Sequence, residues 1–103
     1  MSYDAYIEKC KAPKAKAKVH NIVHHLLIGI RKGYTSQYLA DRLNQFKVYT
    51  LMAKHWTANS VQMQLLKMKR FDNDSSLAWG FAHALSTGLA TEDDLELLAS
   101  RVR

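Results

Sequence analysis

Three of the five histidines fall within residues 20–25, and their spacing is the first hint of metal or acid–base chemistry. His20 and His24 lie one helical turn apart, and His25 follows directly. In a helical zinc hydrolase a glutamate directly after the first histidine activates the attacking water, whereas this chain has Asn21 there. The spacing indicates no third ligand. We therefore expect these histidines to border a helix, and we expect neither a metal nor a cofactor.

The other residue types that carry catalysis do not form a recognisable pattern. Ser60 and Cys10 have no base near them in the sequence. Asp93, Asp94 and Glu96 stand where a helix is expected to begin, and carboxylates there favour the positive end of the helix dipole. The sequence contains neither a phosphate-binding loop nor a dinucleotide-binding fingerprint. We therefore expect that this protein is not an enzyme.

The composition indicates one small domain. The chain has 103 residues, and its longest apolar run, Leu26–Ile30, is far shorter than the ~18 residues that cross a membrane. Its single cysteine excludes an internal disulfide and a metal site built from cysteines. These features favour a cytoplasmic protein that does not associate with a membrane.

Charge divides the chain into two parts. Fifteen Lys and Arg against nine Asp and Glu give a net charge of +6. Residues 1–70 hold thirteen basic and three acidic residues, whereas residues 71–103 hold two basic and six acidic ones. A basic body with an acidic end is typical of a protein whose first part binds phosphate. The alternative is an ordinary basic protein with solvated lysines.

The elements that must position these residues are helices. Apolar residues recur at steps of three and four, most regularly over Val19–Ile30, and Gly33 is placed to end that helix. We therefore predict an all-α fold, a small bundle of five or six short helices. Further helices are expected to begin at or after Thr35, Thr57, Ser75 and Thr91, the third of them reaching about Thr87.

The predicted organisation has an N-terminal extension and one helical domain. Residues 1–18 form a basic arm or a short helix at 2–12, interrupted by Pro13, and the alternating Ala and Lys of residues 14–18 are either helical turns or a mobile arm. Residues 19–103 form the domain, with a helix-turn-helix-like unit at 35–70 and acidic helices at 71–103. The expected inward side chains are Leu39, Leu43, Phe46, Val61, Leu65, Met68, Leu77, Phe81, Ala84, Leu85, Leu95, Leu98 and Val102.

A motif within residues 35–70 resembles the helix-turn-helix segment that follows the catalytic domain in serine recombinases. The chain departs from the family at Lys47 and Ala53, where the family has glycine. The resemblance covers about a third of the chain, which has no room for the serine nuclease domain. It implies a DNA-reading module without the catalytic part. The matching residues are Leu39-Ala40, Leu43-Asn44, Val48-Tyr49-Thr50, Trp56-Thr57-Ala58, Ser60-Val61 and Leu65.

The helix after Thr57 is the predicted reading helix, because its apolar edge turns inward and polar side chains remain outside. Amide and hydroxyl groups can bond base edges, whereas Lys and Arg bond phosphates. The predicted base contacts are Asn59, Ser60 and Gln62. The predicted phosphate contacts are Arg31, Lys32, Lys54, Lys67, Lys69 and Arg70, together with Lys14, Lys16 and Lys18 of the N-terminal arm.

Two functions therefore stay open. The first is a small basic protein that binds double-stranded DNA, alone or as a homodimer, as a regulator or recombination accessory factor of a phage or other mobile element. The second is a phage-type protein that binds and modulates or inhibits a host protein or nucleic-acid enzyme, with Trp79, Met63 and Leu66 as contacts. Trp79 is either such an anchor or a core residue of a helix buried on two faces.

Overall fold

The computed structural model describes residues 13–101, with side chains from Ala17 onward. This part of the chain is all-α, as predicted, and holds five helices and no strand. The helix expected at residues 2–12 and the inward side chain expected at Val102 lie outside the described residues. The helices are α2 (Pro13–Lys32), α3 (Ser36–Gln45), α4 (Ala58–Arg70), α5 (Ser76–Thr87) and α6 (Glu92–Arg101).

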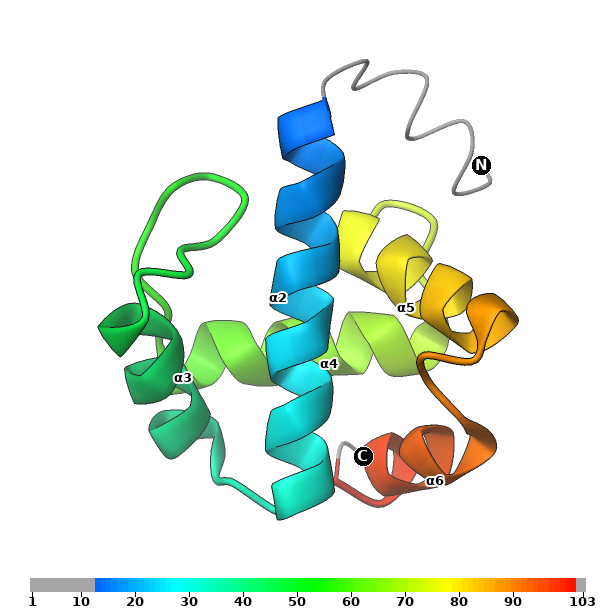
Figure 1. Cartoon of the computed structure of the whole chain (residues 1–103). Coiled ribbons are helices and arrows are strands. Elements are labelled where there is room, and N and C mark those ends of the chain that lie inside the picture. The colour runs from blue at the N-terminus through cyan, green and yellow to red at the C-terminus, as the bar shows by residue number, and fades with distance from the viewer. Residues whose placement is uncertain (1–12, 102–103) are drawn as a thin grey trace.

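The long helix α2 is the centre of the fold, and α3, α5 and α6 all pack against it. Figure 1 shows α3 on one side of α2, α5 and α6 on the other, and α4 crossing behind. Proline is well tolerated at the first helical position, and α2 begins at Pro13, so residues 14–18 are helical turns. The buried stripe of α2 is Val19, Ile22, Val23, Leu26, Leu27 and Ile30.

Helices α2 and α5 approach closely because α5 carries a glycine at their crossing. A Cβ atom added to Gly80 would lie 2.8 Å from Cγ1 of Val19 and 3.0 Å from Cγ2 of Val23. Real Cβ contacts are longer, so any larger residue would push the helices apart. Glycine therefore allows the tight α2–α5 packing on which the bundle rests.

Local capping signals place the helix ends. The side chain of Thr35 accepts a hydrogen bond from the Tyr38 amide, and Thr57 forms a capping box with Ser60. Helix α5 is capped by Ser75, whose side chain accepts a hydrogen bond from the Ala78 amide. The α2 helix ends at the left-handed Gly33 (φ 71°), as expected.

The structure corrects the expectation for Phe46 and decides between the two alternatives for Trp79. Phe46 was expected to face inward, but it is 52 % exposed. Phe46 lies one turn after Arg42, to whose carbonyl its amide donates, and its ring lies beside the Arg42 side chain instead of entering the core. Trp79 is only 6 % exposed, because α5 is buried on nearly every side, and it is therefore not an exposed partner anchor. The other inward residues predicted on the described helices are buried or half-buried.

Candidate nucleic-acid interface

Helix α4 keeps one face uncovered, as the sequence predicts for the reading helix. Its inner edge is Val61, Leu65 and Met68, which are fully buried. The opposite face carries Asn59 and Arg70, both exposed. Because α3, α5 and α6 all pack on the inner side of α4, its outer face is open to a partner in this part of the chain.

The apolar members of this face have different surroundings. Met63 is 51 % exposed, so its side chain can contact a partner. Leu66 is half-buried and packs against the hydrophobic core. Of the two contacts predicted here for a protein partner, only Met63 therefore projects well clear of the fold.

The loop before α4, residues 46–57, is held by the residues that carry the recombinase resemblance. The side-chain Nδ2 of Asn44 donates to the Trp56 carbonyl (2.8 Å), and the Trp56 amide donates to Asn44 Oδ1 (2.7 Å). The indole Nε1 of Trp56 donates to the Val48 carbonyl (2.7 Å). Since Trp56 is 3 % exposed, it fastens the loop to the core from inside.

The loop adopts left-handed backbone at two positions where the resembling family has glycine. Lys47 and Ala53 both have φ near 59°. At Lys47 the chain leaves α3, and the Val48 amide donates to the Leu43 carbonyl. At Ala53 it closes a tight turn in which the Thr50 amide donates to the Lys54 carbonyl and the Ala53 amide to the Thr50 carbonyl.

A basic groove of about 470 Å³ runs between this loop and the first turns of α2. Lys18 on α2 and Lys47 on the loop are its two charged residues. Cations on both walls suit a phosphate, so Lys18 retains its predicted role. The side chains of Lys14 and Lys16 lie outside the described residues. The groove is lined by Ala17, Lys18, Asn21, Lys47, Val48 and Tyr49.

Two of the predicted base contacts also take part in the fold. Ser60 accepts a hydrogen bond from the Thr57 amide (2.8 Å), which is its half of the capping box. Gln62 is exposed, and its Oε1 accepts from Ser36 Oγ (2.8 Å), which joins α4 to the start of α3. Ser60 therefore has a structural role in the capping box, Gln62 keeps its Nε2 donors and Asn59 is exposed.

The predicted phosphate contacts also divide by environment. Lys32 and Lys54 are exposed, as is Arg70. Lys69 is half-buried. Lys67 is half-buried too and forms an ion pair of 3.6 Å with the exposed Asp74, a contact that exchanges readily for a phosphate.

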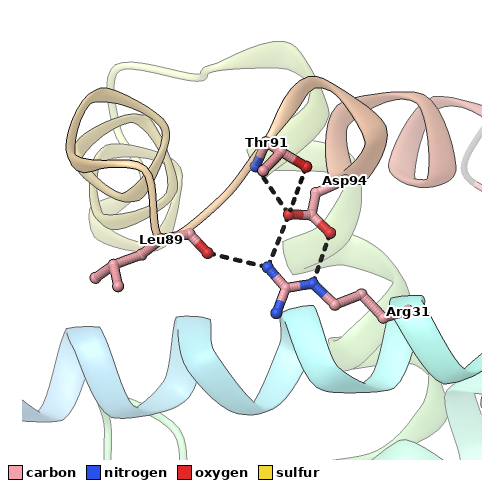
Figure 2. Close-up of polar contacts among 4 residues, drawn as sticks. All are labelled: Arg31, Leu89, Thr91 and Asp94. Atoms are coloured by element: carbon pink, nitrogen blue, oxygen red, sulfur yellow. Dashed lines mark hydrogen bonds and ion pairs between the residues drawn. The ribbon is translucent and has the colours of Figure 1, made fainter.

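Arg31, a predicted phosphate contact, is engaged by the fold (Figure 2). Its Nε donates to Asp94 Oδ1 (2.7 Å) and its Nη2 to Asp94 Oδ2 (2.8 Å) and to the Leu89 carbonyl (3.0 Å). The Thr91 amide also donates to Asp94 (2.9 Å). Arg31 therefore joins the end of α2 to the start of α6.

Asp94 was expected to be a surface charge at a helix start, but it is 2 % exposed. Hydrogen bonds from Arg31 hold the pKa of Asp94 below its usual range and outweigh the burial that raises it. The signal that could have indicated this pair is the basic end of one helix and the acidic start of another, which complement each other.

His20, His24 and His83 lie apart from this interface, whereas His55 belongs to the loop at 46–57 and His25 stacks on Phe46 at its start. His20 and His24 line a second groove of about 770 Å³ between α2 and α5, together with His83, whose ring centroid is 5.3 Å from that of His20. Among residues 13–101 no group of three or more His, Cys, Asp and Glu lies close enough to hold a metal ion. Burial lowers the pKa of His25, and the charges of His24 and Arg42 lower it further.

Comparison with family models, curated proteins and solved structures found no match to this chain. Within the described part, none of the helices combines the length and the apolar character that a membrane span requires.

Proposed function

We propose that this protein binds double-stranded DNA through the outer face of α4 and the loop at 46–57. The observation that carries the proposal is charge: no Asp or Glu occurs from Arg42 to Phe71. A duplex approaching α4 and its loop therefore meets cations and polar groups along this segment, with Asp74, the ion-pair partner of Lys67, as a carboxylate at its end. The basic residues of this segment are Arg42, Lys47, Lys54, Lys67, Lys69 and Arg70.

The outer face of α4 has the side chains that read base edges. Asn59 is exposed at the start of the helix, where side chains of a recognition helix meet the bases. Gln62 is held by Ser36 and presents its amide nitrogen to a partner. Met63 is the apolar member of this face and is suited to a thymine methyl group. We infer that Arg70 and Lys67 bond phosphates beyond these bases.

The loop supports the likeness to the recombinase segment. Residues 46–57 form a longer connection than the three or four residues of a common helix-turn-helix. Lys47 and Ala53 take the left-handed backbone that glycine adopts most easily, and the family has glycine at both positions. We propose that the protein acts as a regulator or recombination accessory factor of a mobile element.

A mobility-shift titration against mixed-sequence duplex at two salt concentrations tests the proposal. The double variant Lys67→Ala/Arg70→Ala should weaken binding and reduce the slope of log affinity against log salt by about 2, one for each phosphate contact. A control variant, Ala99→Glu/Ser100→Glu, lowers the net charge by the same two units at exposed positions of α6. It should bind duplex nearly as well as the unchanged protein.

Equal weakening by both double variants would show that only total charge matters, and it would remove α4 from the mechanism. Duplex binding that persists in Lys67→Ala/Arg70→Ala with an unchanged salt slope would do the same. The alternative function, modulation of another protein, has lost one predicted anchor because Trp79 is buried. Capture of one specific protein at high salt, reduced by Met63→Ala, would favour that alternative.

A further inference from the structure

A second surface, on α3, combines an arginine with three aromatic rings. The guanidinium carbon of Arg42 lies 5.3 Å from the ring centroid of Tyr34, 5.8 Å from that of Tyr38 and 5.2 Å from that of Phe46. These distances are within cation–π range. Three rings at once fix the position of a side chain that is ordinarily mobile.

The rings reach from the core to solvent. Tyr34 packs against the hydrophobic core and meets Tyr38 edge-on, with ring centroids 4.6 Å apart. Tyr38 is 47 % exposed and Phe46 is 52 % exposed. The ring of Phe46 also stacks on His25, at 6.0 Å between centroids and 28° between ring planes. The surface is thus anchored at Tyr34 and His25 and open at Tyr38 and Phe46.

The guanidinium of Arg42 has no hydrogen bond or ion pair with any described residue of the chain. Its sequence neighbour Asp41 instead accepts a hydrogen bond at Oδ1 from the side-chain Nε2 of Gln37 (2.9 Å). The N–H donors of Arg42 are therefore available for an anion. Because burial and nearby charges lower the pKa of His25, this ring is neutral at neutral pH and adds stacking area without a second charge.

We propose that Tyr38, Arg42 and Phe46 form a binding site for single-stranded nucleic acid. Unpaired bases stack on the half-exposed rings of Tyr38 and Phe46, and Arg42 bonds the intervening phosphate. The bases of a duplex have their faces covered by neighbouring pairs, so they cannot use these rings. An acidic peptide would use the charge of Arg42 but leave the two rings without a partner. The strand therefore matches both halves of the surface.

This site lies beside the proposed duplex interface: Phe46 begins the loop at 46–57 and Arg42 is one of the basic residues of that segment, but no residue of the site lies on the outer face of α4. The test is fluorescence anisotropy with a labelled oligothymidine of about 15 nucleotides. This length suits one small single-strand site. Three further probes are an abasic strand of equal length, a duplex of equal length and a polyglutamate peptide. Circular dichroism melting shows that each variant is folded.

The double variant Tyr38→Leu/Phe46→Leu should weaken binding of the oligothymidine about tenfold, and Arg42→Gln about fivefold. Duplex affinity should fall by a smaller factor in each variant, because the outer face of α4 is unaltered. The control Leu97→Ala removes a comparably exposed apolar side chain from α6 and should leave binding of every probe unaltered. The abasic strand should bind weakly to both the unchanged protein and the double variant.

Equal affinity of the unchanged protein for the abasic strand and the oligothymidine would overturn the site, because no stacking would then occur. Tight binding of polyglutamate would overturn it as well, because the surface would then select charge alone. Loss of duplex binding in the α4 variants with intact oligothymidine binding bears on the proposed function and leaves this site standing.

Discussion

The side-chain amide of Asn44 exchanges two hydrogen bonds with the main chain of Trp56, as donor to the carbonyl and as acceptor from the amide. Asn44, at the end of α3, thus pairs with the main chain of Trp56 as a neighbouring β-strand would. Asn44 and Trp56, which belong to the recombinase-like motif, therefore hold the loop in place. The loop in turn positions α4 and its polar side chains.

Asn44→Ala should destabilise the protein by about 2 kcal/mol, because two hydrogen bonds are lost and the buried amide of Trp56 is left without an acceptor. Denaturant unfolding measures this change. Limited proteolysis should show faster cleavage within residues 46–57. Asn59→Ala is the matched control, since Asn59 is exposed, and it should change stability by less than about 0.5 kcal/mol. Equal effects of the two variants would contradict the role assigned to Asn44.

Ala53→Gly should stabilise the protein by about 0.5–1 kcal/mol. Left-handed backbone costs an L-residue about 1–2 kcal/mol, and the greater freedom of glycine in the unfolded chain returns part of that gain. Thermal melting detects the change. Ala99→Gly, at an exposed helical position of α6, should instead destabilise by up to about 1 kcal/mol. If both glycine variants destabilised, the backbone at Ala53 would not carry the strain inferred here.

The Arg31–Asp94 pair should make stability fall at acid pH. The folded-state pKa of Asp94 is below its usual value, so the folded protein binds fewer protons than the unfolded chain. The stabilisation is complete above the unfolded pKa of about 4 and disappears as the pH falls through the lower folded-state pKa. Melting temperatures from pH 7 to pH 2 should show this loss, and Asp94→Asn should reduce the slope. An unchanged slope in Asp94→Asn would assign the acid sensitivity to other groups.

Arg31→Ala tests the same pair at neutral pH. It leaves the buried carboxylate of Asp94 with only the hydrogen bonds from Thr91, at a cost of about 2 kcal/mol, a figure kept modest because the Arg31 side chain is 42 % exposed. Lys32→Ala removes the neighbouring exposed cation and should be almost neutral. Urea titrations of the two variants give the comparison, and similar midpoints would contradict a structural role for Arg31.

Two helical glycines should respond differently to alanine. A Cβ at Gly80 would meet Val19 and Val23, whose branched side chains are stiff within a helix, and we expect a loss of about 1–3 kcal/mol. A Cβ at Gly29 would meet the Cδ atoms of Leu39 at 2.7 Å, the flexible end of a side chain. Gly29→Ala should therefore be nearly neutral, since alanine also favours the helix. Thermal unfolding of Gly80→Ala and Gly29→Ala measures the two losses of stability. A larger loss for Gly29→Ala would contradict this explanation.

The helix boundaries were predictable because their causes are local. Thr35 and Thr57 cap the helices that follow them, and Gly33 ends α2, each through a contact within a few residues. The apolar period likewise predicted most of the core. It was wrong at Phe46, because Phe46 also continues the row of Tyr38 and Arg42 at steps of four, and its ring packs beside Arg42 and His25 on that side.

The parts that were not predicted depend on distant partners. Arg31 and Asp94 stand 63 positions apart, so neither the burial of the carboxylate nor the engagement of the arginine could be read from its neighbours. The cluster around Arg42 is partly local, since Tyr38 and Phe46 lie one turn to either side, but its closure by His25 requires α2 to pack beside α3. The candidate interface on α4 was predicted as a face, whereas its loop framework was not.

The separation of Arg31 and Asp94 along the sequence has a consequence for folding during translation. During translation the end of the central helix emerges long before the segment that neutralises its guanidinium, because the two are separated by most of the chain. Folding during synthesis can therefore assemble the early helices, but it cannot form the Arg31–Asp94 pair that joins α2 to α6. We expect the final cooperative step to follow the emergence of the segment that carries Asp94, and truncated chains that lack this segment to leave Arg31 without its carboxylate partner.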